Sequence, residues 1–195
     1  PSLVERFGLF TIIVLGEVVV GVVAGVSAHH HLNWLIISTA ALGTLVAIGL
    51  WWLYFDFISH PPPIHETASV AGWFYLHLPL TMGITAVGAS VLIILEHGGE
   101  HLPIEVQWLL IGSLAIVLLS VAALVHTIRS SEEESQMHRV GSRKLLFSTF
   151  LMVVLGVIEI PGIWMLVALI VLIYMPVFFG FVAWLQATEQ PPSIQ

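Results

Sequence analysis

Apolar residues along this chain fall into six long stretches that short polar segments separate. The stretches cover residues 5–27, 33–57, 67–95, 105–128, 143–160 and 163–187. A helix of about 20 residues crosses the hydrocarbon core of a bilayer, and backbone polar groups in lipid must be satisfied within the segment. The pattern therefore predicts an all-α fold, a polytopic transmembrane bundle with six membrane-spanning helices.

Proline and glycine punctuate the pattern between these stretches. The run 61–63 is Pro-Pro-Pro and ends the second stretch, and Pro161-Gly162 leaves only a tight turn before the sixth. The fifth and sixth stretches should therefore be antiparallel neighbours. Residues 129–144 are the one long polar segment, which we interpret as a charged, solvated cytoplasmic linker. The expected parts are a four-helix transmembrane segment (1–128), this linker (129–144) and a transmembrane hairpin with a tail (145–195).

The polar segments alternate in charge along the chain. All five basic residues fall on one side of the six-span topology: Arg6, Arg129, Arg139, Arg143 and Lys144. The opposite segments, 28–32, 96–105 and 159–162, contain no Lys or Arg. By the positive-inside rule, both termini of this segment are expected to be cytoplasmic. Tryptophan prefers the membrane interface, and the seven tryptophans fall near the expected span ends: Trp34, Trp51, Trp52, Trp73, Trp108, Trp164 and Trp184.

Composition supports the membrane class and narrows the chemistry. Hydrophobic residues make up 58% of the chain and charged residues 9%, which excludes an ordinary soluble domain and makes the lipid bilayer the expected partner. With no cysteine there is neither a disulfide nor a thiolate metal site. No basic patch interleaved with aromatic residues is present, so nucleic acid is not an expected partner. No catalytic or phosphate-binding signature stands out, so neither an enzyme nor a cofactor is predicted.

Four ionisable residues lie within or beside the apolar stretches: Arg6, Glu17, Asp56 and His77. Such residues usually face a bundle interior or a wet cavity, because a charge in lipid is costly. Counting inward at about 1.5 Å per residue places Glu17 and His77 at similar depths, where they can pair. Asp56 falls at the level of Arg6, which predicts an ion pair. A buried Glu–His couple can bind a proton, a cation or a small solute; the alternative is a structural network that orients helices.

Histidines on the expected outer side offer a further possibility. His29, His31, His97 and His101 share that side with several carboxylates, and imidazole with carboxylate can bind zinc or copper. Short histidine-rich tracts are more often solvated loops, and the neighbouring glycines argue against a rigid metal cage. The sequence leaves metal binding open.

Three runs resemble motifs of the bacterial low temperature requirement A (LtrA) family. They are VERFGLFTIIVLGE at residues 4–17, LWWLYFD at 50–56 and YLHLPL at 75–80. The runs contain Arg6, Glu17, Asp56 and His77. Members of that family are polytopic membrane proteins about twice as long, so the resemblance implies a C-terminal half without its N-terminal helices. It also implies a bacterial cytoplasmic membrane location and an association with growth in the cold.

The sequence leaves several classes of function open. The favoured one is a transporter or channel component that binds a proton, cation or small solute at the Glu17–His77 site. The alternative is a non-catalytic subunit of a larger membrane complex, with a missing N-terminal half or other membrane subunits as partners. A membrane enzyme using Glu17 and His77 as acid and base is a weaker third hypothesis.

Overall fold

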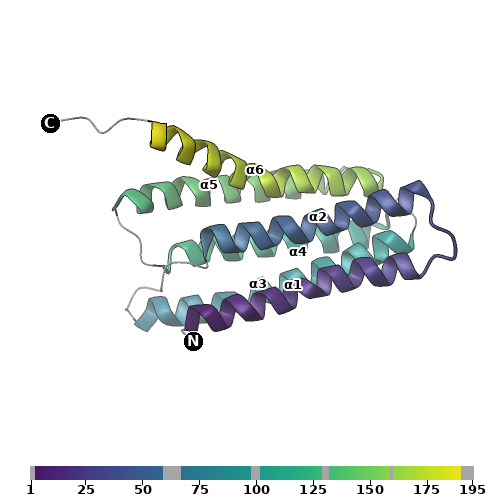
Figure 1. Cartoon of the computed structure of the whole chain (residues 1–195), viewed down its shortest axis with the longest axis horizontal. Helices are drawn as coiled ribbons and strands as arrows, with labels where there is room; N and C mark the ends of the chain where they lie inside the picture. The colour runs from purple at the N-terminus through teal and green to yellow at the C-terminus, as the bar shows by residue number, and fades with distance from the viewer. Residues whose placement is uncertain (1–2, 59–66, 98–101, 129–131, 159, 190–195) are drawn as a thin grey trace.

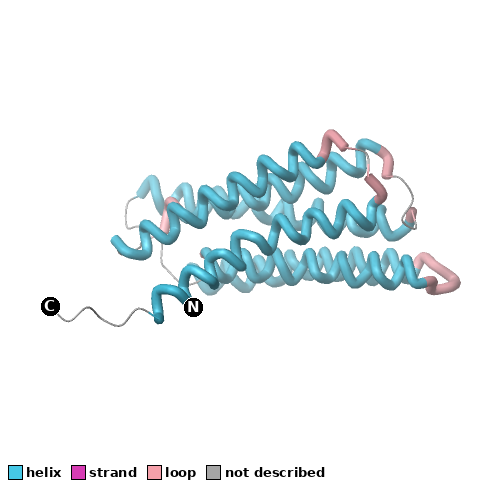
Figure 2. The backbone as a smooth tube through the Cα atoms, turned by 90° about the horizontal axis from the view of Figure 1, so that it is seen from above, coloured by secondary structure: helices cyan, strands magenta, loops and turns pink. Residues whose placement is uncertain are grey.

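The computed structural model describes residues 3–58, 67–97, 102–128, 132–158 and 160–189. Within these ranges the chain has six helices and no strand. They are α1 (Leu3–Ser27), α2 (Trp34–Phe57), α3 (Thr67–Glu96), α4 (Ile104–Val125), α5 (Glu132–Leu155) and α6 (Gly162–Glu189). Consecutive helices run in opposite directions, so α1 begins and α6 ends at the same end of the bundle (Figure 2). The all-α prediction is confirmed.

Four helices, α1 to α4, are long and apolar enough to cross a membrane. A shorter apolar helical run, Gly162–Phe178, belongs to α6. At about 1.5 Å per residue, a helix of 22 residues such as α4 reaches about 33 Å, close to the thickness of the hydrocarbon core. The chain therefore has the dimensions of a multi-pass membrane protein.

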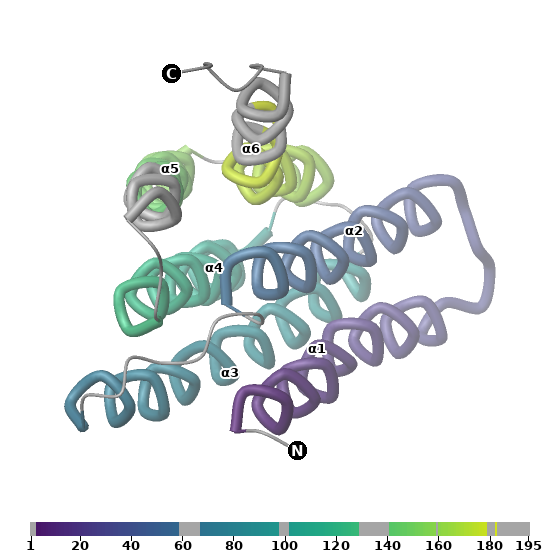
Figure 3. Tube along the Cα trace, turned by 60° about the vertical axis from the view of Figure 1, so that its left-hand side comes forward, coloured from purple at the N-terminus to yellow at the C-terminus, as the bar shows by residue number. Residues whose placement is uncertain are grey.

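The helices pack in a closed ring, in the order α1, α3, α4, α5, α6, α2 and back to α1. Seen from the side, they form three tiers of two: α1 with α3, α2 with α4, and α5 with α6 (Figure 1). The order around the ring can be followed in Figure 3. The predicted hairpin of the last two helices is thus continuous with the rest of the bundle, because α5 packs on α4 and α6 on α2.

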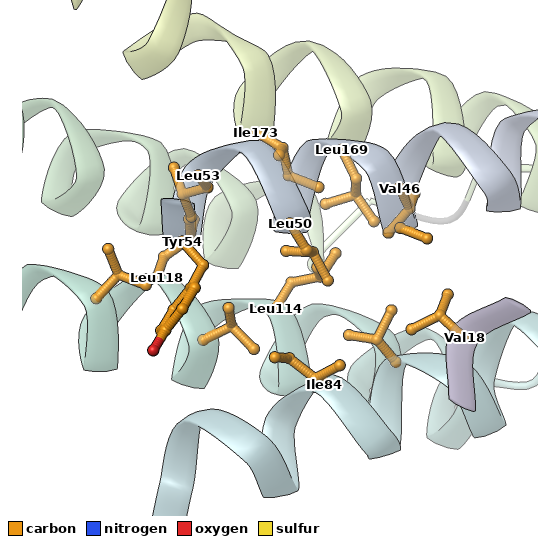
Figure 4. Close-up of a cluster of buried hydrophobic side chains, with 14 of the residues drawn as sticks. Val18, Val46, Leu50, Leu53, Tyr54, Ile84, Leu114, Leu118, Leu169 and Ile173 are labelled. Carbon is orange, nitrogen blue, oxygen red and sulfur yellow. The ribbon is translucent and has the colours of Figure 1, made fainter. Parts of the chain in front are cut away.

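Apolar side chains from every tier fill the centre of the ring. Leu50 and Leu53 of α2 meet Leu114 and Leu118 of α4 there, with Ile173 of α6 above them (Figure 4). All five are at most 1% exposed. Lipid tails are as apolar as leucine, so this core stabilises the bundle through close packing more than through exclusion of water.

The tightest helix contact is between α1 and α3, where two glycines bring the backbones together. A Cβ on Gly21 would collide with the Gly88 carbonyl oxygen, and one on Gly88 would lie 2.8 Å from the Glu17 carbonyl oxygen. Gly25, one turn after Gly21, packs on Leu95. Small residues at this spacing allow close approach in membranes, and here they fix how far α1 is shifted along α3.

The polar segment predicted as a solvated linker is largely helical. Residues 132–144 form the first half of α5, so the expected span 143–160 is shifted toward the N-terminus. No proline interrupts the segment, and Gly141 packs on Phe57 at the end of α2. Local helix propensity therefore outweighed the polar composition.

Side chains satisfy backbone groups at two helix ends. The Asn33 side chain accepts the Ile36 N–H at 2.8 Å and caps the start of α2. At the end of α5, the buried Gln107 of α4 donates to the carbonyls of Gly156 at 2.9 Å and Ile158 at 3.0 Å. These bonds satisfy carbonyls that have no partner within the helix, so α5 can end while still packed on α4.

Replacement of Gly88 by alanine should destabilise the bundle. The new Cβ would meet only backbone atoms of Glu17 and Val18, which cannot rotate away, so we expect a loss of about 1–3 kcal/mol. Thermal unfolding in detergent measures it. Gly112→Ala is the matched control, because a Cβ there meets nothing within 4 Å. Equal melting temperatures for the two variants would contradict a tight α1–α3 contact.

Candidate functional site

His77 is the most deeply buried ionisable side chain of the expected site. It lies on α3 and is 1% exposed. Three elements surround it: Phe7 of α1, Tyr54 of α2 and Trp73 on the preceding turn of α3. Its position is ten residues, about 15 Å, from the start of α3, well inside the span. An imidazole at this depth requires partners for both of its nitrogens.

Both nitrogens have partners, and these define the tautomer. Nδ1 lies 2.7 Å from the Trp73 carbonyl oxygen, which only accepts, so Nδ1 carries the hydrogen. Nε2 of the neutral ring is then an acceptor, and the Tyr54 hydroxyl donates to it at 3.1 Å. The ring is thereby held between α2 and α3 in one orientation.

The Thr11 side chain on α1 is close to the Tyr54 hydroxyl. Thr11 donates its own hydrogen to the Phe7 carbonyl oxygen at 2.8 Å, so its oxygen is an acceptor toward Tyr54. A line of hydrogen-bonding groups therefore runs from His77 through Tyr54 to Thr11 and the backbone of α1. It joins three helices at one level of the bundle.

Aromatic rings enclose the imidazole. The centroid of His77 lies 4.3 Å from that of Trp73 and 4.7 Å from that of Phe7. Phe7 also makes edge contacts with Trp73 and Phe74. Burial disfavours a protonated imidazole, and aromatic rings within about 6 Å can offset part of that cost.

Pro79 lies inside α3 beside this cluster, and the helix continues through it. Proline has no N–H to donate to the preceding turn. Thr81 donates its hydroxyl to the His77 carbonyl oxygen at 2.9 Å and the Leu78 carbonyl oxygen at 3.0 Å. The backbone around His77 is therefore partly supported by a side chain, as is usual where proline interrupts a membrane helix.

A pocket of about 330 Å³ lies between α1 and α3, and His77 lines it. Thr81 also reaches it, and Arg6 contributes a guanidinium. The remaining lining is apolar: Phe7, Phe10, Phe74 and Leu78. Phe10, Phe74 and Leu78 are 48%, 50% and 62% exposed, so the pocket opens on the lateral surface of the bundle.

Glu17 does not meet His77. The Glu17 backbone is level with Gly88, and Gly88 is eleven residues, about 16 Å along α3, beyond His77. The Glu17 side chain is exposed rather than turned toward α3. The predicted buried couple is therefore wrong, because the packing of α1 on α3 holds the two residues at different depths.

Arg6 and Asp56 do lie at the same end of the bundle. Gly8 faces Phe55 across α1 and α2, which brings these helix ends level. Both side chains are exposed. Arg6, however, faces the α1–α3 pocket, whereas Asp56 is on α2.

The outer histidines bind the backbone of the bundle. His29 Nε2 lies 2.8 Å from the Leu95 carbonyl oxygen, and His97 Nδ1 lies 2.8 Å from the Ile93 carbonyl oxygen. His31 is exposed, and His101 falls outside the described residues. In the described ranges, no group of three or more histidine or carboxylate side chains is placed to hold a metal ion.

Sequence reasoning did not select Tyr54, Thr11 or Trp73 for the site. Tyr54 was within reach, since it stands two residues before Asp56 in the same family motif. Trp73 was expected at the membrane interface, but it is fully buried, at 0% exposure, against His77. Its indole N–H has no acceptor in the described part of the structure, which leaves an unused donor in the cluster.

Long apolar helices around a buried polar cluster define a polytopic α-helical integral membrane protein. The comparison with protein families matches residues 1–184 to the family described as bacterial low temperature requirement A protein (LtrA). This match covers most of the chain, and the chain belongs to the LtrA family. The comparisons with curated proteins and with solved structures gave no match.

Replacement of Tyr54 by phenylalanine should destabilise the fold. It removes the donor to His77 Nε2 and leaves a buried acceptor without a partner, which costs about 1–3 kcal/mol. The melting temperature in detergent is the measurement. Tyr75→Phe serves as the control, because Tyr75 is 69% exposed. If Tyr54→Phe unfolds at the same temperature as Tyr75→Phe, the hydrogen bond to His77 does not stabilise the fold.

Proposed function

We propose that the chain is a component of a membrane transporter or channel, and that His77 is its proton-binding site. The observation that carries the proposal is a buried imidazole lining a pocket that also holds Arg6. Ionisable side chains inside transmembrane helices commonly mark ion and proton pathways. Histidine is the residue whose charge changes most readily near neutral pH.

The hydrogen-bonding groups around His77 support uptake of a proton. When Nε2 gains a hydrogen, it becomes a donor, and the Tyr54 oxygen can accept it. The Tyr54 hydrogen then turns toward Thr11, whose oxygen can accept because its own hydrogen goes to Phe7. Each group keeps a partner in both protonation states. The rings of Trp73 and Phe7 stabilise the cationic form.

Arg6 bears on the choice between a cation and another solute. A fixed guanidinium in the pocket repels metal cations, and a protonated His77 would add to that repulsion. The same two groups attract an anionic group. A pocket of about 330 Å³ is at the lower end of the range for small-molecule sites. The geometry therefore favours a proton, alone or together with a small anionic solute.

The orientation proposed for the pocket follows the charge pattern. Arg6 lies in the first turns of α1, at the end of the bundle that carries the basic residues. By the positive-inside rule this end faces the cytoplasm of a bacterial cell, with the chain in the cytoplasmic membrane. His77 would then exchange protons with the cytoplasmic side. We assign no enzymatic reaction to the site, since the Glu17 carboxylate expected as an acid or base lies elsewhere.

Proton flux into liposomes tests the proposal. The full-length protein is reconstituted with an internal pH-sensitive dye, and a membrane potential drives protons inward. Replacement of His77 by glutamine keeps hydrogen-bonding capacity but removes the titrating ring, so flux should fall to the level of empty liposomes. His126→Gln is the matched control, because His126 is exposed at the end of α4.

Flux is compared only for variants that match the wild type in gel-filtration elution volume and melting temperature. Wild-type flux no higher than that of empty liposomes would overturn the transport proposal. Equal flux through the wild type and His77→Gln would leave transport standing but remove His77 from the path.

One observation favours a second function, that of a non-catalytic subunit in a larger membrane assembly. The carboxylate of Glu17 is exposed on the lateral surface of α1. A side chain of this kind usually faces protein rather than lipid. The two functions are compatible, since a transporter component can also bind other chains.

A further inference from the structure

Glu17 lies near the middle of α1 on a face that is otherwise apolar. It is 14 residues from Leu3 and 10 from Ser27, or about 21 Å and 15 Å from the helix ends. The neighbours on the same face, Ile13 and Val20, are 70% and 59% exposed. Glu17 is therefore a carboxylate near the middle of the hydrocarbon core of the bilayer. Within the described residues, no other side chain covers it.

The groove between α1 and α2 lies on a different side of α1 from Glu17. It is lined from α1 by Ile12, Gly16 and Val19, whereas Ile13, Glu17 and Val20 project from another side of the helix, because successive residues are about 100° apart. Ile13 and Val20 are exposed there, so a second helix can lie along this side of α1. Figure 3 shows α1 and α2 side by side on the outside of the ring.

We propose that this face binds a transmembrane helix of a partner subunit that carries an arginine or lysine near mid-membrane depth. The basic side chain would pair with Glu17 while the body of the helix packs on Ile13 and Val20. Charge complementarity carries the argument, since a carboxylate in hydrocarbon is stabilised by a cation and by exclusion of lipid from the pair. The proposal deepens the subunit role and does not depend on a proton at His77.

A second copy of this chain cannot supply the cation. Arg6 lies in the first turns of α1, and Arg143 and Lys144 follow Gly141, which packs on Phe57 at the end of α2. Arg6 precedes Glu17 by eleven residues, about 16 Å along the axis. In a parallel pair of chains, Arg6 of one copy would therefore miss Glu17 of the other. An antiparallel pair would place the basic ends on opposite sides of the membrane, against the positive-inside rule.

Energy transfer in liposomes tests the pairing with a defined probe. The chain has no cysteine, so Val20→Cys takes a single donor fluorophore on this face of the chain. The probe is an acceptor-labelled leucine–alanine peptide of about 20 residues, long enough to span, with one central lysine. The comparison peptide has leucine at that position. We expect binding of the lysine peptide at lower peptide-to-lipid ratios than the leucine peptide.

Glu17→Gln should abolish this preference, and Glu105→Gln, at an exposed glutamate in the first turn of α4, should retain it. Melting temperatures verify that both variants fold. Equal binding of the two peptides by the wild type would overturn the proposal, as would binding of neither. Energy transfer between donor- and acceptor-labelled copies of the protein, lost in Glu17→Gln, would assign the face to a second copy instead.

A photo-crosslinker attached at Val20→Cys in native membranes gives a second readout. The expected product joins this residue to an apolar segment with a central arginine or lysine, identified by mass spectrometry, and Glu17→Gln should reduce its yield. Products with lipid alone would overturn the proposal. Neither energy transfer nor crosslinking measures proton flux. Both experiments can therefore be interpreted even if the transport proposal fails.

Discussion

The contact between the backbones of α1 and α3 determines which polar side chains meet. Gly21 and Gly88 permit an approach at which neither helix can slide without a clash. At this register Phe7 lies against His77, and Thr11 reaches Tyr54. The same register carries Glu17 well beyond the imidazole. The contact between Gly21 and Gly88, more than two turns away, therefore determines which residues of α1 lie against His77.

The histidine cluster differs from most hydroxyl groups of the described helices, because its Tyr54–His77 hydrogen bond crosses from one helix to another. Many buried hydroxyls donate to a carbonyl of their own helix, as Thr39 does to Leu35 and Ser120 to Ile116. Bonds that cross between helices include Tyr54 to His77 and Gln107 to the end of α5. The Gln107 bonds satisfy backbone groups at a helix end. The Tyr54–His77 bond joins two side chains inside the spans, and one of them can change its charge.

The sequence predicted what depends on local pattern. The stretch 33–57 became α2 at Trp34–Phe57, because hydrophobic length and turn residues define a membrane helix without reference to its neighbours. The segment 132–144, predicted as a charged linker, is helical, which its polar composition did not indicate. The Glu17–His77 couple failed for a different reason. Counting residues from each helix end gives similar depths only if the two helices are aligned at their ends, and the stagger comes from tertiary packing.

His77 and Glu17 are both ionisable residues within membrane-spanning helices, but their surroundings differ. His77 is neutral in its present hydrogen bonds, and α1, α2 and its own helix α3 satisfy and enclose it. Glu17 has no such enclosure, and Arg6, the basic residue of α1, is about three turns away along the helix. The histidine site is therefore complete within one chain, whereas the carboxylate requires a donor from outside the described helices. This asymmetry places the internal chemistry at the α1–α2–α3 junction and the proposed outward recognition on the lateral surface of α1.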